Sequence, residues 1–248
     1  MNKRMLVGSC ALAAVLVTQQ VSAEAVHWDY SGKAGPEHWG DLAPEFSACS
    51  SGRNQSPINL SGMVEGELPK LQIDYKPGGN EAIINNGHAI QVNYAPGSTL
   101  SLGSNTFELK QFHFHSPSEN TIEGKHAPME AHFVHADAKG NLAVIAVMFQ
   151  EGGTNAELEK AWAHMPAHKD ETKTLPVPVD AVALLPKNQD YYRFSGSLTT
   201  PPCSEGVVWL VMKEFSGASK SQIGKFTAAL HHPNNRPVQP VNARVVIQ

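Results

Sequence analysis

Cysteine is scarce in this chain, with three among 248 residues, and no two of them form a CxxC pair. This absence argues against a zinc site built from thiolates, which needs cysteines at close spacing. Cys10 lies in the N-terminal stretch 1–23, which we expect to be removed as a signal peptide for the reasons given below. The mature chain therefore keeps two cysteines, Cys49 and Cys203. In an oxidising compartment two cysteines most simply form one disulfide. Their use as zinc ligands stays open as the alternative, although their spacing does not suit it.

Long hydrophobic runs are missing after residue 23. The longest is 142–149, which is far shorter than the stretch of about 20 apolar residues that a membrane-spanning helix needs. The sequence therefore predicts no membrane span.

The N-terminus has the pattern of an export signal. Lys3 and Arg4 precede a mostly apolar stretch over 5–17, and Val21-Ser22-Ala23 carries the small residues that signal peptidase recognises. We therefore expect a signal peptide over 1–23, a mature domain over 24–248, and an exported protein that is periplasmic or secreted.

Basic patches are also absent. Without residues 1–23, 17 Lys and Arg side chains stand against 23 Asp and Glu, a net charge of about −6, and these charges are dispersed. Nucleic acid is therefore not an expected partner. The sequence has no internal repeat or low-complexity tract, and a chain of this length can bury one core without cross-links.

Short alternating apolar segments dominate what is present, rich in Val, Ile and Phe and separated by Gly, Asn and Pro, as in strands. They are 71–75, 82–85, 89–94, 107–115, 130–134, 142–149 and 207–212. Helices are expected over 155–165, with a capping box from Thr154 and Glu157, and over 219–230. The Pro-rich stretch 166–186 is expected to be a surface loop.

The most informative segment runs from Gln111 to His115. Successive side chains of a strand alternate between its faces, so His113 and His115 point one way and the intervening phenylalanines the other. Two imidazoles about two strand rises apart, roughly 7 Å at the backbone, can reach one metal. A second strand places Glu130 and His132 on one face, so that His132 completes a set of three nitrogen ligands.

Three neutral imidazoles suit a catalytic zinc. They leave the full +2 charge on the metal, so that a water in the fourth position loses its proton near pH ~7. Any one histidine taken alone is better read as an ordinary core or surface residue. Pairing His132 with His135 is less suitable, because residues three apart on a strand face opposite ways.

The chain resembles the alpha-class carbonic anhydrases, particularly the exported bacterial ones, from about residue 27 to the end. The matching blocks occur in the family's order and at family-like spacing. They are Gly35-Pro36-Glu37-His38-Trp39, Gln55-Ser56-Pro57-Ile58, Asn85-Asn86-Gly87-His88, 111–115, Ser118-Glu119, 130–135, 197–203, Asn235-Arg236-Pro237 and Gln239-Pro240.

The resemblance implies an enzyme that hydrates carbon dioxide reversibly to bicarbonate and a proton. Its cofactor would be Zn²⁺ on the three histidines, and zinc-bound hydroxide would attack the substrate. Each ligand is expected to have a hydrogen-bond partner that fixes its tautomer. For His113, His132 and His115 in turn, these partners are Gln111, Glu130 and the backbone carbonyl of Asn242.

The resemblance also gives roles to Glu119 and Thr199. Ionised Glu119 would accept a hydrogen bond from the Thr199 hydroxyl, and Thr199 would then orient the zinc-bound hydroxide by accepting a hydrogen bond from it. The carbon dioxide pocket should be apolar. Around the substrate the resemblance places Val134, Val144, Leu198, Thr199, Thr200, Val207 and Trp209.

Proton export is assigned by the resemblance to His88, because an imidazole with a pKa near ~6.5 exchanges protons close to neutrality. The expected water chain between cleft and shuttle is ordered by three further residues. These are Tyr30, Asn86 and Gln91, of which the last is Asn in many relatives.

The resemblance pairs Cys49 with Cys203, the disulfide of the exported members. The implied fold is mainly β with peripheral helices (α+β). It is a single domain built on a large, mostly antiparallel twisted sheet, with zinc at the base of a central conical cleft. Carbon dioxide and bicarbonate are the expected small-molecule partners. The sequence is also compatible with a homodimer.

Two other classes of function stay open. One is a binding protein that has kept the fold and lost the metal, against which the three retained histidines argue. The other is an exported zinc-scavenging protein, suggested by the 12 histidines of the chain. Their dispersed placement argues against it.

Overall fold

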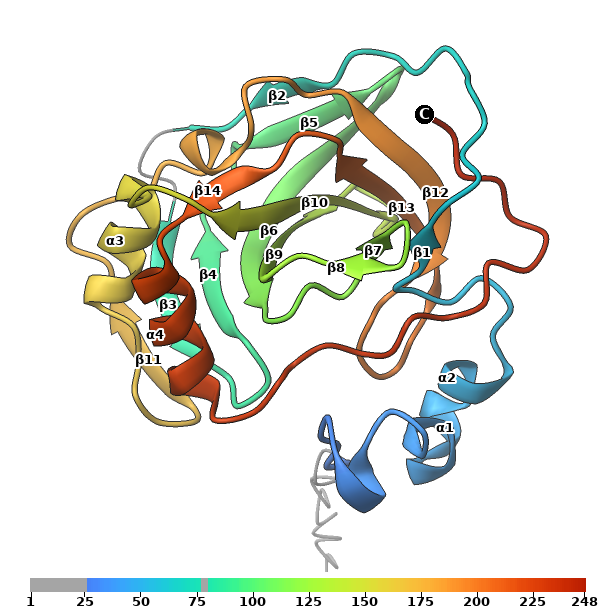
Figure 1. Cartoon of the computed structure of the whole chain (residues 1–248), viewed down its shortest axis with the longest axis horizontal. Helices are drawn as coiled ribbons and strands as arrows, with labels where there is room; N and C mark the ends of the chain where they lie inside the picture. Colours follow the sequence, from blue (N-terminus) through green and yellow to red (C-terminus); the bar gives the residue numbers. More distant parts are fainter. Residues whose placement is uncertain (1–25, 77–79) are drawn as a thin grey trace, which may run out of the picture.

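The computed structural model describes residues 26–76 and 80–248, so the predicted signal peptide lies outside the described residues. Strands dominate (Figure 1). They are β1 (Asn59–Leu60), β2 (Gln72–Asp74), β3 (Asn80–Asn85), β4 (Ile90–Tyr94), β5 (Thr99–Leu102), β6 (Asn105–His115), β7 (Thr121–Ile122), β8 (Lys125–His126), β9 (Met129–Ala136), β10 (Leu142–Glu151), β11 (Glu171–Thr174), β12 (Tyr191–Ser197), β13 (Glu205–Met212) and β14 (Ser216–Ala218). The helices are α1 (Trp39–Leu42), α2 (Ala48–Ser51), α3 (Ala156–Ala163) and α4 (Lys220–Leu230), with 3₁₀ turns at Gly32–Ala34, Pro44–Phe46 and Val182–Leu184.

One large sheet of eleven strands organises the described residues. Its main path is β11-β3-β4-β6-β9-β10-β13-β12, with β2, β5 and β14 attached at the side. The pairings are antiparallel except that β10 runs parallel to both β13 and β14. A small second sheet joins β1, β7 and β8. The predicted single domain on a large, mostly antiparallel sheet is confirmed.

The two faces of the central strands carry different side chains: one packs into the hydrophobic core and the other carries the histidines. Phe112, Phe114 and Phe133 belong to the larger hydrophobic core, which also holds Trp162 of α3 and Phe226 of α4. Helices α3 and α4 lie side by side at one end of the sheet (Figure 1), and the Trp162 ring stacks on Phe226 with centroids 5.8 Å apart. The opposite face of the same strands carries the three histidines, as strand alternation predicts.

The register between β6 and β9 sets the histidines beside one another. His113 lies directly opposite His132, and His115 lies opposite Glu130. The ladder shifts between Leu109 and Gln111, where Lys110 has no partner on β9. Such a bulge lets an extra residue enter one strand without changing the pairing beyond it.

The two longer helices begin where the sequence predicts, but the first is capped differently. The side chain of Asn155, and not Thr154, accepts hydrogen bonds from the amides of Glu157 and Leu158 at 3.0 and 3.1 Å. The predicted Thr154 capping box is therefore wrong. At α4, Ser219 and Gln222 form a reciprocal capping box that the sequence interpretation did not identify.

The stretch 166–186 is more than a surface loop, so that prediction is wrong in part. Strand β11 within it pairs with β3 at the edge of the sheet. Leu175, Val179 and Leu184 are buried in the large core. The prolines of this stretch led to the prediction of a loop, and the apolar residues between them were overlooked.

A disulfide joins Cys49 of α2 to Cys203. The pair is buried against Trp39 in a small third cluster. This connection is the one expected, and it is consistent with export. Among the described residues, no helix has the length and apolar character needed to cross a membrane.

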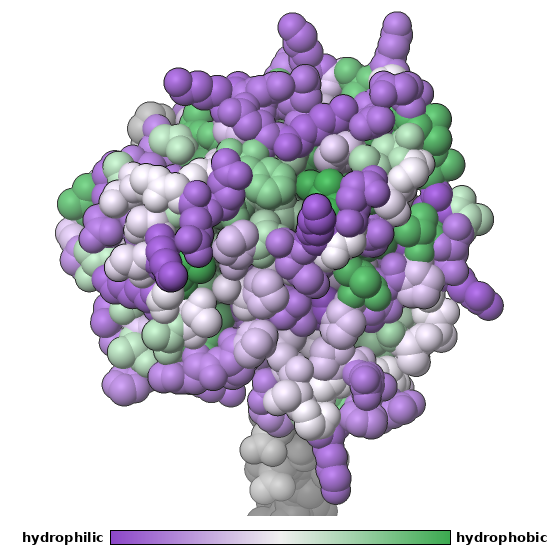
Figure 2. Space-filling model, in the orientation of Figure 1, coloured by the Kyte–Doolittle hydropathy of each residue, from purple (hydrophilic) through white to green (hydrophobic). Residues whose placement is uncertain are grey.

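The surface in Figure 2 is mostly hydrophilic on the face shown, with hydrophobic residues scattered rather than gathered in one broad patch. Among the described residues, the large hydrophobic side chains with the greatest exposure are isolated valines. They are Val64, Val177, Val182, Val238 and Val245.

A buried histidine away from the metal-binding candidates makes stability depend on pH. His135 is fully buried, with Nδ1 3.1 Å from the carbonyl oxygen of Ala143 and Nε2 2.6 Å from the hydroxyl of Tyr75. A carbonyl can only accept, so Nδ1 carries the proton and Nε2 accepts from Tyr75. Burial lowers the pKa of His135 to about 4.

We therefore expect acid destabilisation that depends on His135. Above pH ~6.5 this residue is neutral in both states, whereas between about 6.5 and 4 only the unfolded chain binds its proton. Its contribution to the free energy of unfolding should fall by roughly 3 kcal/mol over that range. Urea denaturation between pH 7 and pH 4 should show a shallower loss for His135→Gln, which can keep both hydrogen bonds. His126→Gln, at an exposed site, is the control, and equal slopes in all three proteins would contradict the assignment.

Candidate metal centre

Three imidazoles converge on one face of β6 and β9. One nitrogen each of His113, His115 and His132 can be chosen so that all lie within 4.8 Å of one another. Their ring centroids are 4.5 to 5.3 Å apart. His115 and His132 are buried and His113 is half-buried. The structure therefore brings together the three side chains that the sequence selected.

The partners behind each ring determine which nitrogen is free. Gln111 Oε1 lies 2.8 Å from His113 Nδ1, and the Asn234 carbonyl oxygen lies 2.6 Å from His115 Nδ1. Both oxygens accept, so each Nδ1 carries the proton and each Nε2 offers a lone pair. His132 is turned the other way, because its Nε2 lies 3.1 Å from a carboxylate oxygen of Glu130. Its free nitrogen is therefore Nδ1.

The donor set fits a bound metal. His115 Nε2 is buried and has no hydrogen-bond partner, a costly arrangement unless something else binds the lone pair. Burial lowers the pKa of all three rings, and neighbouring histidines lower those of His113 and His132 further. All three are thus neutral ligands at neutral pH. Three imidazole nitrogens suit Zn²⁺ and leave one position open in a tetrahedral site.

Asn242 is not the partner of His115, so that part of the prediction is wrong. Asn242 is exposed, and its side chain donates to the carbonyl oxygen of Arg53 at 2.7 Å. The carbonyl of Asn234 takes the place beside His115, because the segment after α4 runs past the end of β6. The same Asn234 side chain accepts from the Ser116 amide and donates to the Phe114 carbonyl. It fixes both the ligand and the strand that carries it.

Glu130 is held firmly behind His132. Its Oε2 accepts from the amides of Glu119 and Asn120 at 2.6 and 2.9 Å, and its Oε1 accepts from the Asn120 side chain at 2.8 Å. Burial raises the pKa of Glu130, and these hydrogen bonds lower it in part. Asn120 was not identified from the sequence. A short polar residue after Ser118-Glu119 gives no signal of this role.

Glu119 and Thr199 lie together, as the resemblance implies. The Glu119 Oε1 atom accepts from the amide of Arg236 at 2.9 Å, and the Thr199 side chain also hydrogen-bonds to this carboxylate. Burial nevertheless raises the pKa of Glu119 to about 8. For the chain alone the carboxyl is therefore largely protonated at neutral pH, which differs from the expected ionised form. Its Oε2 lies 3.5 Å from His115 Nε2, so a dication bound there would favour the carboxylate.

Arg236 is a further residue that sequence reasoning left without a role. Its guanidinium is buried and donates to Gln55 Oε1, to the Ser56 carbonyl and to the Cys49 carbonyl, at 2.8 to 2.9 Å. Its backbone amide binds Glu119. It thereby connects the N-terminal region, the disulfide and the centre of the site.

The side chains expected to form the apolar pocket pack together as one wall. Val144, Val207 and Trp209 are buried in one hydrophobic cluster, and Val134 and Leu198 pack against it. The edge of the Trp209 ring faces His132, with centroids 4.9 Å apart. This wall is therefore next to the three imidazoles.

The remaining predicted residues gather in a cleft of about 140 Å³ beside the histidines. Its lining includes Tyr30, Asn86, His88, Gln91, His113, His115 and Thr200. Asn86 shapes the turn by accepting from the amides of His88 and Ala89 at 2.9 and 2.7 Å. Gln91 lies opposite His113 in the sheet, and its side chain donates to Asn93.

His88 stands at the edge of this cleft. Its ring stacks on Trp28 with centroids 3.7 Å apart and planes 12° apart. Burial and, to a lesser extent, the positive charge of Lys169 lower the pKa of His88 to about 4. The expected value near neutrality is therefore not found in this arrangement, so His88 holds a proton only weakly.

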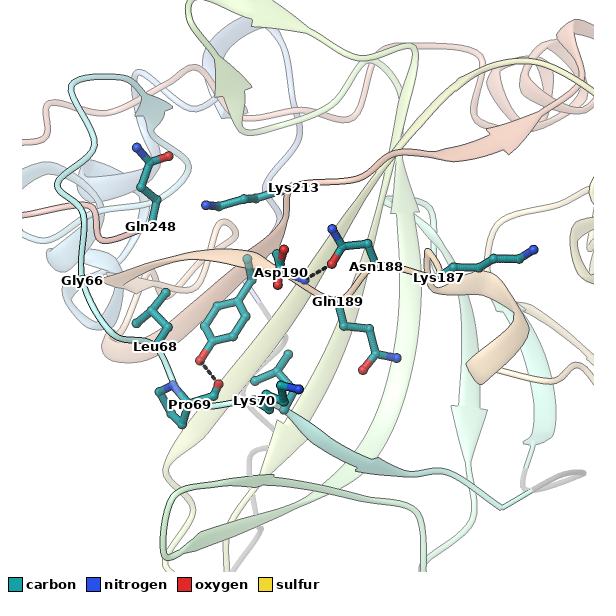
Figure 3. A pocket seen from close by; sticks show the side chains of 12 residues that line it. Gly66, Leu68, Pro69, Lys70, Lys187, Asn188, Gln189, Asp190, Lys213 and Gln248 are labelled. Carbon is teal, nitrogen blue, oxygen red and sulfur yellow. Dashed lines mark hydrogen bonds between the residues drawn. The ribbon is translucent and has the colours of Figure 1, made fainter.

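A separate hollow of about 430 Å³ lies between the segment before β2, the start of β12 and the chain end (Figure 3). Lys70, Lys187 and Lys213 line it, but Lys213 extends toward Gln248 while Lys187 points away. The Tyr191 hydroxyl donates to the Pro69 carbonyl at 2.7 Å and closes one side. The cations do not converge on one ligand, and none of the predicted site residues lies here.

Comparison with known proteins agrees with this geometry. A model of the eukaryotic-type carbonic anhydrase family matches residues 34–248. A carbonic anhydrase of Pectobacterium carotovorum is 51% identical over 96% of this chain and 98% of its own. One of Neisseria gonorrhoeae is 50% identical over 96% and 94% of the two chains. The solved alpha-carbonic anhydrase of Thermovibrio ammonificans, in complex with the inhibitor sulfanilamide, has a TM-score of 0.89 at 49% identity and covers 91% of this chain and 100% of its own.

Proposed function

Because the chain belongs to the alpha carbonic anhydrase family of metalloenzymes, we propose that it hydrates carbon dioxide reversibly to bicarbonate and a proton, with zinc as its metal. The observation that carries this proposal is the convergence of three neutral imidazoles. Gln111 and Asn234 hydrogen-bond to His113 and His115 from behind, and a carboxylate oxygen of Glu130 lies 3.1 Å behind His132. His113 and His115 would bind through Nε2 and His132 through Nδ1. The nitrogen donors and the open fourth position favour zinc over metals that prefer oxygen ligands.

A dication bound there supplies the Lewis acidity that turns a water into a nucleophile near neutral pH. The protein would keep the positive charge of the dication undiminished and would hold the three imidazoles in a fixed geometry. Neutral ligands add no negative charge, and the partners Gln111, Asn234 and Glu130 prevent the rings from turning.

Thr199 orients the attacking oxygen in this proposal. Its hydroxyl would donate to the Glu119 carboxylate, so its own oxygen lone pairs would remain to accept a hydrogen bond from the nucleophile. Glu119 is held in turn by the Arg236 amide. The contribution is orientational, because it selects one lone-pair direction for attack.

The apolar wall receives the substrate. Carbon dioxide is small and uncharged, so it would rest against Val134, Val144, Leu198, Val207 and Trp209 without displacing a required polar contact. The proton released would leave along the cleft past Thr200, Tyr30, Asn86 and Gln91 to His88.

Stopped-flow hydration of carbon dioxide, before and after chelation, tests the proposal. The zinc-loaded protein should hydrate carbon dioxide far above background, the chelated protein should not, and added zinc should restore the rate. Sulfanilamide, which is bound in the Thermovibrio ammonificans structure, should block the activity. A folded protein with one zinc and no hydration above background would instead favour a binding protein that has kept the fold.

We also propose that residues 1–23 are a signal peptide and that 24–248 form the exported enzyme. The N-terminal pattern and the Cys49–Cys203 disulfide support this assignment. N-terminal sequencing of the protein recovered outside the cytoplasm should begin at Glu24. Retention of Met1 on that material would contradict it.

A further inference from the structure

A second hollow, of about 370 Å³, lies on the other side of His88 from the metal centre. It is framed by the N-terminal segment, the turn after β3, the loop before β11 and the end of α4, at the lower ends of these elements in Figure 1. Five of the chain's 12 histidines line it. They are His27, His88, His168, His231 and His232.

His88 is the one residue that lines both this hollow and the cleft beside the three imidazoles. Its ring is fixed between the two spaces by the stack on Trp28. The backbone carbonyl of His88 also accepts from the side chain of Asn234, whose own carbonyl binds His115. The hollow is thus linked to the metal centre by the hydrogen bonds that join His88 to Asn234 and Asn234 to His115.

We propose that this histidine-lined hollow is the proton exit of the enzyme, in which His88 passes the proton to His27, His168, His231 and His232. The inference rests on the proposed hydration reaction and adds acceptors to it. In each step an N–H bond at one imidazole breaks as an O–H bond forms at a water, or as an N–H bond forms at the next imidazole. Every ring returns to its neutral form when buffer removes the proton.

The state of His88 explains why such acceptors are useful. Its burial disfavours the charged form, so it can carry a proton briefly but cannot store one. His27, His168 and His231 are exposed and His232 is half-buried, so water and buffer can reach their rings. Imidazole is also the side chain that exchanges protons near neutral pH.

His232 is arranged to receive a proton. Its Nδ1 lies 3.0 Å from the carbonyl oxygen of Pro233, so that nitrogen carries the hydrogen and Nε2 is the acceptor. The ring of Tyr30 is a neighbour of both histidines, with centroids 6.4 Å from His88 and 6.2 Å from His232. The hollow has room for several water molecules, at about 30 Å³ each, to bridge the rings.

The charges around His88 also act on a proton carried by its ring. Lys169 lies against the turn so closely that a Cβ on Gly87 would meet its side-chain carbons at 2.7 to 2.8 Å. The positive charges of Lys169, and of His27 and His232 when protonated, disfavour a proton on His88, whereas Asp29 favours it. A proton that reaches His88 is therefore not retained on this ring.

The test uses the zinc-loaded full chain with His27→Gln, His168→Gln, His231→Asn and His232→Gln combined. Asn is chosen at 231 because this residue ends α4 with a left-handed backbone, at φ 64°. We expect kcat for carbon dioxide hydration in weak buffer to fall severalfold with kcat/KM unchanged, and concentrated imidazole buffer to restore it. A matched control, His38→Gln with His126→Gln, removes two exposed histidines elsewhere and should have no effect.

A second readout does not depend on activity. In the four-histidine variant, the NMR titration midpoint of His88 should move to higher pH, because the cationic neighbours His27 and His232 are gone. Lys169→Gln should move it in the same direction. Unchanged kcat in weak buffer together with a loss in His88→Ala would show that His88 passes its proton directly to buffer and would overturn the proposal. An unmoved His88 midpoint would overturn it as well, whereas absence of hydration in the unmodified zinc protein would remove the proposed function itself.

Discussion

Replacing His115 by alanine is expected to remove both zinc binding and carbon dioxide hydration. His115 is a buried ligand, with Nδ1 fixed by the Asn234 carbonyl and an unpartnered Nε2. Two imidazoles on neighbouring strands cannot complete a tetrahedral site with one open position. We expect metal content to fall from one zinc per chain to nearly none, and turnover to fall to background.

Metal analysis and stopped-flow kinetics on the same preparation check this expectation. His38→Ala, at an exposed position, is the matched control and should keep both properties. A melting curve separates loss of the metal from loss of the fold. A His115→Ala protein that is folded, holds one zinc and keeps its turnover would show that the metal lies elsewhere.

Removing the disulfide is expected to produce the largest loss of stability. The link between Cys49 and Cys203 closes a loop with a sequence separation of 154 residues. In the chain-entropy model such a loop is worth about 5 kcal/mol, which is comparable to the whole stability of many domains. The bonded pair is also buried against Trp39, so the change affects a packed cluster.

The double variant Cys49→Ser with Cys203→Ser should therefore unfold at much lower denaturant concentration than the oxidised protein. Reductant should destabilise the unmodified protein to a similar degree and leave the double variant unchanged. Activity should fall with stability, because Cys203 follows the loop that carries Thr199 and Thr200. Identical denaturation curves with and without reductant would show that the bond contributes nothing.

The metal ligands were predictable because the period of a strand is two. Gln111, His113 and His115 had to share a face whatever the strand packed against, and the same rule aligned Glu130 with His132. Asn234 could not be found in this way. Its role depends on where the chain passes after α4, and the alignment of motifs gave Asn242, eight residues too far along.

Several strands were missed for a related reason. Strand β11 consists of polar residues, Glu171 to Thr174, and is held at the sheet edge by backbone pairing with β3. Strand β12 contains Arg193 and Gly196 among its aromatics, so it lacks a clean alternation. Helices α1 and α2 span four residues each, too few for a helical period to be visible. In these elements tertiary contacts, rather than local pattern, decide the structure.

The bulge at Lys110 has a consequence for how chain length can vary here. Phe107 and Leu109 face the large core at odd positions, whereas Phe112 and Phe114 face it at even ones, and the unpaired residue makes the two sets compatible. If Lys110 were deleted, the core-facing residues before and after it would follow one continuous alternation. The imidazoles of His113 and His115 would stay on the face opposite the core. Gaining or losing a residue between Gln111 and His115 would instead turn a ligand into the aromatic interior. Loss of a residue is thus tolerable at Lys110, whereas a change of length between Gln111 and His115 would disrupt the metal centre.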